Sequence, residues 1–170
     1  MKIDLKKLIS AKTERIPFEG SMDLSAELFN GEHPFHSPVR YTGEITNHTD
    51  VLRLTGQVEA EYSTRCARCL KPLVIPLSVQ VDMVLLPDNG ETEEEDDIFL
   101  FQGDKIDPEE VLLPELLLNI DMVYLCKEDC RGLCPRCGVD RNVTQCDCGG
   151  KQIDDRLAVL KTLLDSKQDH

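Results

Sequence analysis

Apolar and polar residues alternate with a period of two along the middle of the chain, over residues 39–45, 51–62 and 73–85. Alternation of this kind places the apolar side chains on one face of a β-strand. The polar turn 47–50 separates the first two runs, which is typical of an antiparallel hairpin. Pro76 interrupts the third run, and because it has no backbone N–H it has to lie at a bulge or on a sheet edge.

The patterns on either side of this region are weaker. The first thirty residues predict one early strand or short helix, followed by another strand. Pro87 ends the sheet-forming region, and the apolar run 98–101 is a candidate for a further short strand.

Two helices are predicted in the second half of the chain. Residues 107–120 form the first, because Asp107 can cap it, Pro108 suits its first position and acidic residues follow in its first turn. Pro114 should kink this helix, and its broad apolar face should cover one face of the sheet. Apolar residues at helical spacing over 153–164 predict a second, amphipathic helix.

The cysteines cluster in a pattern that suits a metal. Six of the eight fall within residues 126–148. Cys134-x2-Cys137, with Pro inside and Gly after it, lets backbone amides turn around a pair of thiolates, and Cys146-x-Cys148 supplies a second close pair. Four sulfur ligands are what a closed structural zinc site requires. Buried free cysteines that act as small apolar side chains fit poorly beside so many Gly, Pro, Asp and Arg residues.

The remaining cysteines allow a second site. Cys66-x2-Cys69 is predicted at the tip of the hairpin that joins the runs 51–62 and 73–85, where zinc knuckles are common. A second zinc ion would combine this pair with Cys126 and Cys130, whose i, i+4 spacing would put both sulfurs on one face of a helical turn. The alternative is a single zinc ion, with the other cysteine pairs free or redox-active.

Length and charge narrow the class of protein. The chain has 170 residues, no Trp and a formal net charge of -13, which predicts one well-cored domain with a small appended module. An acidic protein has no general attraction to nucleic acid or anionic membranes. The segment 88–110 carries eleven acidic residues and one lysine. This acidic loop is either a solvated loop or a docking surface for a basic partner such as a ribosomal protein.

The expected compartment is the cytoplasm. Neither a signal sequence nor a membrane span is recognisable, so we expect no membrane partner. Cytosolic thiols stay reduced, which favours metal ligands over disulfides.

Together these patterns predict an α+β fold. We expect an antiparallel β-sheet, as a meander or partial barrel, covered by one or two helices and followed by a C-terminal cysteine-rich zinc module. The predicted boundary divides the chain into residues 1–125, which carry the sheet, the zinc-knuckle hairpin, the acidic loop and the first helix, and residues 126–170.

Three motifs stand out together: Arg65-Cys66-x2-Cys69-Leu70-Lys71-Pro72, the cysteine segment from Cys130 through Asn142 to Cys148, and Asp155-Arg156-Leu157-x2-Leu160. As a set they resemble the YceD family, the large ribosomal RNA subunit accumulation proteins. The resemblance implies a bacterial or plastid factor needed for accumulation of the large-subunit ribosomal RNA, with metal and nucleic-acid binding. Asp140 and Arg141 stand where many members carry Asn-Leu.

The leading functional hypothesis is a non-catalytic ribosome assembly factor. Zinc-held turns would present basic side chains to phosphates of ribosomal RNA; the candidates are Arg65, Arg68, Lys71, Arg131, Arg136 and Arg141. Nearby acidic residues offset much of this charge, and no aromatic platform for stacking bases is evident. Binding of a basic ribosomal protein through the acidic loop is therefore a comparable route.

Two other classes remain as alternatives. The Cys-x2-Cys pairs could serve a thiol oxidoreductase or a redox-sensitive zinc switch, but in thioredoxin-like proteins the first cysteine opens a helix, whereas here a strand follows the pair. A zinc hydrolase would need an open coordination position and a general base, and no His-Glu-x2-His pattern occurs. We therefore expect no enzyme, and no small-molecule substrate is evident.

Overall fold

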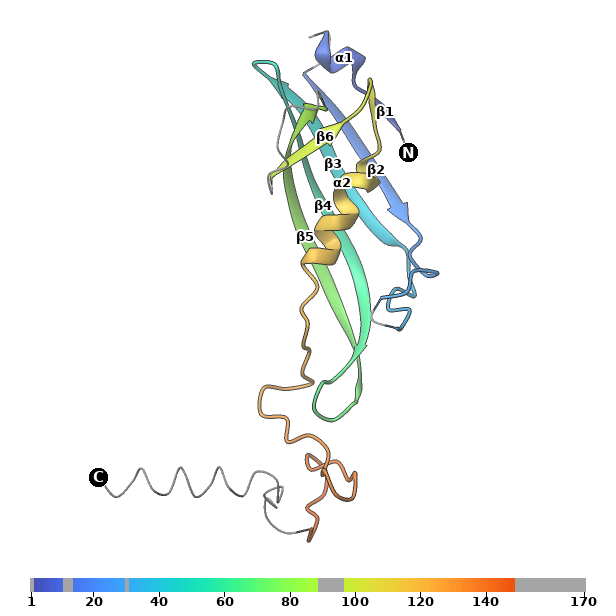
Figure 1. The fold of residues 1–170 in the computed structure, drawn as a ribbon, viewed down its shortest axis with the longest axis vertical. Helices are drawn as coiled ribbons and strands as arrows, with labels where there is room; N and C mark the ends of the chain where they lie inside the picture. The colour runs from blue at the N-terminus through green and yellow to red at the C-terminus, as the bar shows by residue number, and fades with distance from the viewer. Residues whose placement is uncertain (1, 11–13, 30, 89–96, 149–170) are drawn as a thin grey trace, which may run out of the picture.

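The protein, seen here in a computed structural model, is built around a long twisted sheet (Figure 1). The structure describes residues 2–10, 14–29, 31–88 and 97–148. The predicted helix 153–164 and residues 89–96 of the acidic loop lie outside these ranges.

Five strands form the main sheet in the order of the chain, as in a meander. They are β2 (Arg15–Met22), β3 (Val39–His48), β4 (Val51–Arg65), β5 (Pro72–Pro87) and β6 (Ile98–Phe101). A small second sheet pairs β1 (Ile3–Asp4) with β7 (Lys105–Ile106). The two helices are α1 (Lys6–Ile9) and α2 (Pro108–Leu118).

The three strands predicted from the period-two runs are present. β3 and β4 pair up to His48 and Val51, with both intervening residues at positive φ, as a tight two-residue hairpin turn requires. Pro76 pairs with Glu61 of β4, and β6 pairs with β5 only over Val84–Pro87. Within the described residues Pro76 therefore lies where β5 is a sheet edge, as expected for a residue without an N–H.

The sheet is mixed rather than wholly antiparallel. β6, the short strand expected over 98–101, pairs with β5 in the parallel direction, with Val84 opposite Ile98. A tight turn cannot join two consecutive parallel strands, because the chain has to return to the end at which the first strand began. Residues 88–97 connect the two strands. Periodicity alone could not reveal this direction, because a strand has the same pattern in either orientation.

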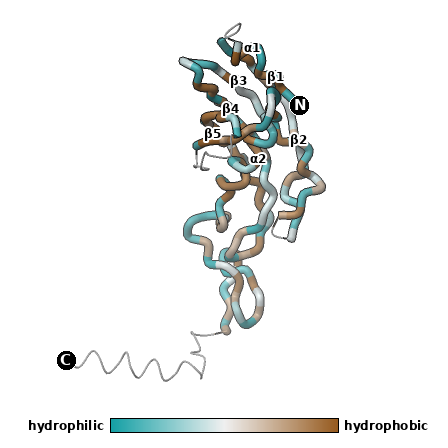
Figure 2. Tube along the Cα trace, turned by 45° about the horizontal axis from the view of Figure 1, so that its top comes forward, coloured by the Kyte–Doolittle hydropathy of each residue, from teal (hydrophilic) through white to brown (hydrophobic). Residues whose placement is uncertain are grey.

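The core lies between the sheet and α2. Asp107 caps the helix by accepting a hydrogen bond from the N–H of Glu109, and Pro108 occupies its first turn, as predicted. Leu112 and Leu116 of α2 are fully buried in the same cluster as the inward side chains of the strands. Along β3, β4 and β5, hydrophobic and hydrophilic positions alternate (Figure 2). The extent to which helices cover the sheet stays a prediction, since the second one lies outside the described residues.

A pair of glycines brings the strands and the helix together. Gly43 of β3 lies directly opposite Gly56 of β4. A Cβ at Gly43 would lie 2.6 Å from the Phe18 ring, and one at Gly56 would lie 3.5 Å from the Leu112 side chain. Because neither glycine has a side chain, Phe18 from β2 and Leu112 from α2 can pack against the backbone at this pair. The Tyr41 hydroxyl of β3 also donates a hydrogen bond to Glu109 (2.9 Å).

None of the helices in the described residues has both the length and the apolar character needed to cross a membrane. The predicted division of the chain after residue 125 stays a prediction.

The packing of α2 can be tested with two leucines of the same helix. Leu112→Ala should lower the free energy of unfolding by about 2–5 kcal/mol, because it leaves a cavity above Gly56. Leu118→Ala is the matched control: its side chain is 78% exposed, so its effect should stay within about 0.5 kcal/mol. Urea titration followed by circular dichroism measures both. Equal losses for the two variants would contradict the packing described here.

Candidate metal centre

The first cysteine pair lies in the turn 66–71, which joins β4 to β5 at the tip of the hairpin. The N–H of Cys66 donates to the carbonyl of Lys71, and the N–H of Leu70 donates to the carbonyl of Cys66, both at 2.9 Å. Leu70 closes the turn with a φ of 62°. The loop therefore folds around Cys66 and Cys69, whose side chains are both buried.

A second turn, 134–139, repeats the same pattern. The N–H of Cys134 donates to the carbonyl of Val139 (2.8 Å), and the N–H of Gly138 donates to the carbonyl of Cys134 (2.9 Å). Gly138, four residues after the first cysteine like Leu70, has a φ of 73°. The two Cys-x2-Cys segments are thus the same knuckle, with Leu in one at a position where Gly is favoured.

The structure gathers the eight cysteines into two sets of four. One set joins Cys66 and Cys69 with Cys126 and Cys130, and in each set the sulfur atoms all lie within 4.8 Å of one another. The other set consists of Cys134, Cys137, Cys146 and Cys148. These are the groupings that the spacings suggested. The first set crosses the predicted boundary at residue 125, because it connects the hairpin tip to the chain beyond α2.

The sulfur separations fit a tetrahedral site. Cys66 Sγ lies 3.8 Å from Cys130 Sγ, and Cys69 Sγ lies 3.6 Å from Cys126 Sγ. Sulfurs at about 2.3 Å from a tetrahedral metal ion are about 3.8 Å apart. Cys126 and Cys130 flank a turn in which the Cys130 N–H donates to Lys127 (3.1 Å), not the helical turn expected from their spacing. Each set of four could therefore hold one metal ion.

Backbone hydrogen bonds hold the hairpin tip against the later segment. The N–H of Ala67 donates to the carbonyl of Tyr124 (2.9 Å), and the N–H of Leu133 donates to the carbonyl of Arg68 (3.1 Å). The Arg68 guanidinium donates in turn to the carbonyls of Glu128 (3.2 Å) and Cys130 (2.9 Å). The four cysteines of the first set are thus brought together by bonds that involve no sulfur.

Asn142, which lies between Cys137 and Cys146 in the sequence, supports Cys130 of the first set, a role that sequence reasoning missed. Its side-chain N–H donates to the sulfur of Cys130 (3.3 Å), while its carbonyl oxygen accepts the N–H of Arg131 (2.8 Å). Hydrogen bonds of this kind orient a metal ligand and favour its thiolate form. The sequence places Asn142 within the cysteine motif, but it does not reveal that the Asn142 side chain contacts Cys130.

The thiols of each set differ in acidity. Burial raises the pKa of the Cys126 thiol to about 12. Burial also opposes ionisation of Cys66, but N–H groups of Cys126, Cys69 and Arg68 outweigh it and lower the pKa of Cys66 to about 6. Backbone hydrogen bonds from Cys137 and Arg136 lower the pKa of Cys134 to about 6. A cation among the sulfurs favours the thiolate of all four ligands, including those that otherwise keep their protons.

The six basic candidates divide into two groups. Arg68 donates to backbone carbonyls as described, Arg136 donates to the carbonyl of Cys148 (2.8 Å), and Arg65 lies 3.8 Å from Glu32. The other three are exposed, and within the described part of the chain they have no side-chain hydrogen bond or ion pair; they are Lys71, Arg131 and Arg141. Sequence reasoning could not distinguish the two groups, because the partners of the first come from distant segments.

Two glycines test how closely the segments fit. Gly132 and Gly138 both have positive φ, but only Gly132 approaches the hairpin tip, where an added Cβ would lie 2.9 Å from the carbonyl oxygen of Arg68. Both alanine variants carry a backbone strain of about 1–2 kcal/mol. Gly132→Ala should in addition break the Leu133 to Arg68 hydrogen bond and speed amide hydrogen exchange at Leu133 at least about tenfold. Gly138→Ala should leave that amide protected, and the opposite order would contradict this packing.

Comparison with known proteins places the chain in a family. The family model described as large ribosomal RNA subunit accumulation protein YceD matches residues 54–164. An uncharacterized protein of Mycobacterium tuberculosis is 34% identical over 74% of this chain and 61% of its own length. The uncharacterized protein YlbN of Bacillus subtilis is 29% identical over 78% of this chain and 77% of its own length.

A plant relative carries a functional name. The large ribosomal RNA subunit accumulation protein YCED homolog 1, chloroplastic, of Arabidopsis thaliana is 25% identical over 81% of this chain and 52% of its own length. The chain thus spans about three fifths of the mycobacterial relative and about half of the plant one. No solved structure matches the chain significantly. The matched region includes both cysteine knuckles, and the chain belongs to the YceD family of large ribosomal RNA subunit accumulation proteins.

Proposed function

We propose that the chain is a non-catalytic, cytoplasmic zinc-binding factor that supports accumulation of the large-subunit ribosomal RNA. Membership of the YceD family supports the link to this RNA, as does the name of the plant relative. The observation that carries the zinc proposal is the pair of four-sulfur sets.

Zinc suits these sets better than other common metals. Four thiolates in a tetrahedral arrangement favour zinc, whereas magnesium and calcium prefer oxygen ligands. When all four positions are occupied by cysteine, none is left for water or substrate, so such a zinc ion is structural rather than catalytic. The same occupancy leaves no free Cys-x2-Cys pair for a thiol oxidoreductase.

Zinc in the first set would fix the hairpin tip to the chain beyond α2. Lys71 lies on the first knuckle, while Arg131 and Arg141 flank the second, beside the hydrogen bond from Arg141 N–H to Gly132 (3.0 Å). Rigid turns that carry unpaired cations can contact RNA phosphates, which position a protein without reading sequence. The partner is either ribosomal RNA at these side chains or a basic ribosomal protein.

Zinc content tests the assignment of the two sets. The purified full-length chain should contain about two zinc ions, one for each set of four cysteines. Cys66→Ala and Cys134→Ala should each lose about one ion, because removal of one thiolate opens one site, and the double variant should lose both. Elemental analysis after anaerobic purification without a histidine tag measures this. Unchanged zinc in Cys66→Ala would show that the first set holds none.

The same variants test the cellular role. In a bacterium that lacks its own family member, the wild-type chain should restore the ratio of large-subunit to small-subunit ribosomal RNA. The double variant should restore it less, provided that immunoblotting shows equal amounts of both proteins. Full restoration by a zinc-free variant would remove zinc from the function while leaving the family role intact.

Filter binding to ribosomal RNA separates the two kinds of partner. Replacing Arg131 and Arg141 by Gln should weaken binding and reduce the slope of log affinity against log salt by about two, if each contacts one phosphate. The control replaces Lys2, which precedes β1, and Lys7 of α1 with the same change of charge. Helix α1 lies at the end of the sheet opposite the hairpin tip that carries the first knuckle (Figure 1). Equal slopes for both variants would favour a protein partner.

A further inference from the structure

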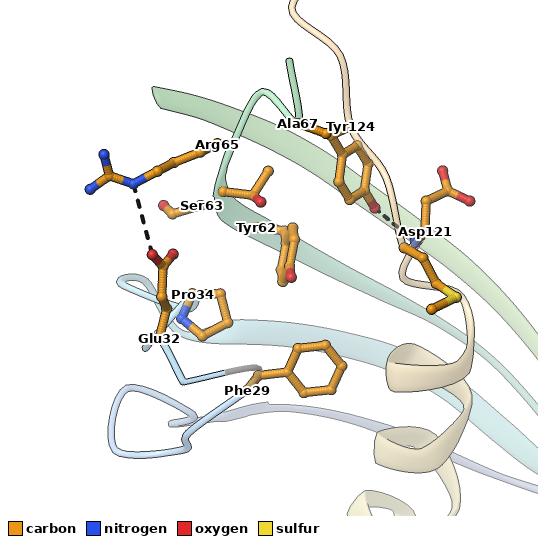
Figure 3. A pocket seen from close by; sticks show the side chains of 11 residues that line it. Phe29, Glu32, Pro34, Tyr62, Ser63, Arg65, Ala67, Asp121 and Tyr124 are labelled. Carbon is orange, nitrogen blue, oxygen red and sulfur yellow. Dashed lines mark hydrogen bonds and ion pairs between the residues drawn. The ribbon is translucent and has the colours of Figure 1, made fainter. Parts of the chain in front are cut away.

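A cavity of about 220 Å³ lies beside the first knuckle, outside the cysteine sets (Figure 3). Three distant parts of the chain form its walls: the turn before β3, the end of β4 and the segment that follows α2. Its principal side chains are Phe29, Glu32, Tyr62, Arg65, Asp121 and Tyr124.

Backbone hydrogen bonds hold these walls in place. The backbone N–H of Phe29 donates to the carbonyl of Glu32 (2.9 Å), and the N–H of Glu32 donates to the carbonyl of Phe29 (3.1 Å). These two bonds fix the backbone of Glu32. The carbonyl of Pro34 accepts the N–H of Ser63 from β4 (2.9 Å). On the other side, two hydrogen bonds hold Tyr124. Its carbonyl accepts the N–H of Ala67, and its hydroxyl accepts the N–H of Asp121 (3.0 Å). The cavity is therefore preformed.

Three aromatic side chains contribute to the lining, and Tyr62 among them is 6% exposed. Tyr62 lies at the centre, with its ring 5.6 Å from the ring of Tyr124 and 6.4 Å from that of Phe29. The face of an aromatic ring carries negative electrostatic potential, and it attracts guanidinium and ammonium groups within about 6 Å. These residues are far apart in sequence, which is why no aromatic platform was evident there.

The charges at the cavity oppose an anionic ligand. Glu32 and Asp121 contribute two carboxylates, against one cation, Arg65, which already lies 3.8 Å from Glu32. Burial, followed by the neighbouring Tyr124 and the charge of Glu32, raises the pKa of Tyr62. The Glu32 carboxylate contributes to this shift, in a chain whose net charge is -13. A phosphate group would be repelled here.

Exposed apolar side chains lie beside the cavity. Met122, one of the lining residues, is 100% exposed, and Val123 is 62% exposed. Within the described part of the chain nothing covers them. Apolar residues around an anionic, aromatic cavity suit a protein surface that places one basic side chain in the cavity and apolar groups on the rim.

We propose that this cavity binds an arginine side chain of a protein partner, stacking its guanidinium on the half-buried Tyr124 ring and pairing it with Glu32. The planar guanidinium combines ring stacking with a fork of donors for a carboxylate, which an ammonium group cannot do as well. The Arg65 to Glu32 pair shows that this carboxylate already accepts a guanidinium partner. The inference rests on the proposed function only in naming the basic ribosomal protein as the kind of partner.

The test uses N-acetyl-arginine amide as the probe, added to the ¹⁵N-labelled full-length protein. Saturable NMR shifts are expected at the amides of Ala67 and Tyr124. N-acetyl-citrulline amide has nearly the same shape without the charge, and it should bind at least about fivefold more weakly. Uridine monophosphate represents RNA. Saturable shifts of the same amides by the nucleotide, equal binding of citrulline, or no saturable shift with arginine would each overturn the proposal.

Matched variants assign the contacts. Tyr124→Leu should weaken arginine binding about fivefold, whereas Tyr124→Phe keeps the ring and should bind as well as the wild type. Glu32→Gln should weaken binding by a similar factor. Glu61→Gln removes the same charge from an exposed residue of β4 that does not line the cavity, and it should have no effect. Zinc content and RNA accumulation are measured independently of arginine binding. A failure of this proposal is therefore distinguishable from a failure of the proposed function.

Discussion

Four sulfurs converge at the tip of the β4–β5 hairpin, and the arrangement of the hairpin tip and of the segment after α2 depends on this convergence. Thiols 3.6–3.8 Å apart cannot all ionise without a cation, because like charges at this distance repel strongly. A metal ion would remove that repulsion and would cross-link β4, β5 and the segment after α2. The hydrogen bonds of Ala67, Arg68 and Leu133 bring these segments into contact without any sulfur.

The sheet explains why such a cross-link is needed. β3 pairs with β4 only as far as Glu59, so within the described residues the final part of β4 pairs with β5 alone. A two-stranded ribbon is marginally stable by itself. Here one side of the ribbon is supported by the rings around Tyr62 and its tip by the cysteines. The extended hairpin is thus stabilised by side chains rather than by further strands.

The basic side chains and the acidic ones have separate roles in this arrangement. Arg68 and Arg136 satisfy backbone carbonyls around the cysteines, so they contribute to the structure of the knuckles. The exposed cations Lys71, Arg131 and Arg141 have no side-chain partner within the described part of the chain. The aromatic cavity carries two carboxylates, and it lies between the end of β4 and Tyr124. This end of the molecule therefore has two chemically distinct surfaces.

Local patterns were sufficient for the strands 39–48, 51–65 and 72–87, for the capped start of α2 at Asp107, and for the cysteine pairs, because period, capping and close spacing are properties of neighbouring residues. Only the tertiary structure decided the parallel direction of β6, the carbonyl partners of Arg68, and the meeting of Phe29, Tyr62 and Tyr124 around a cavity. Each of these depends on the path of the chain between distant segments and on the direction of a side chain, which neighbouring residues do not determine.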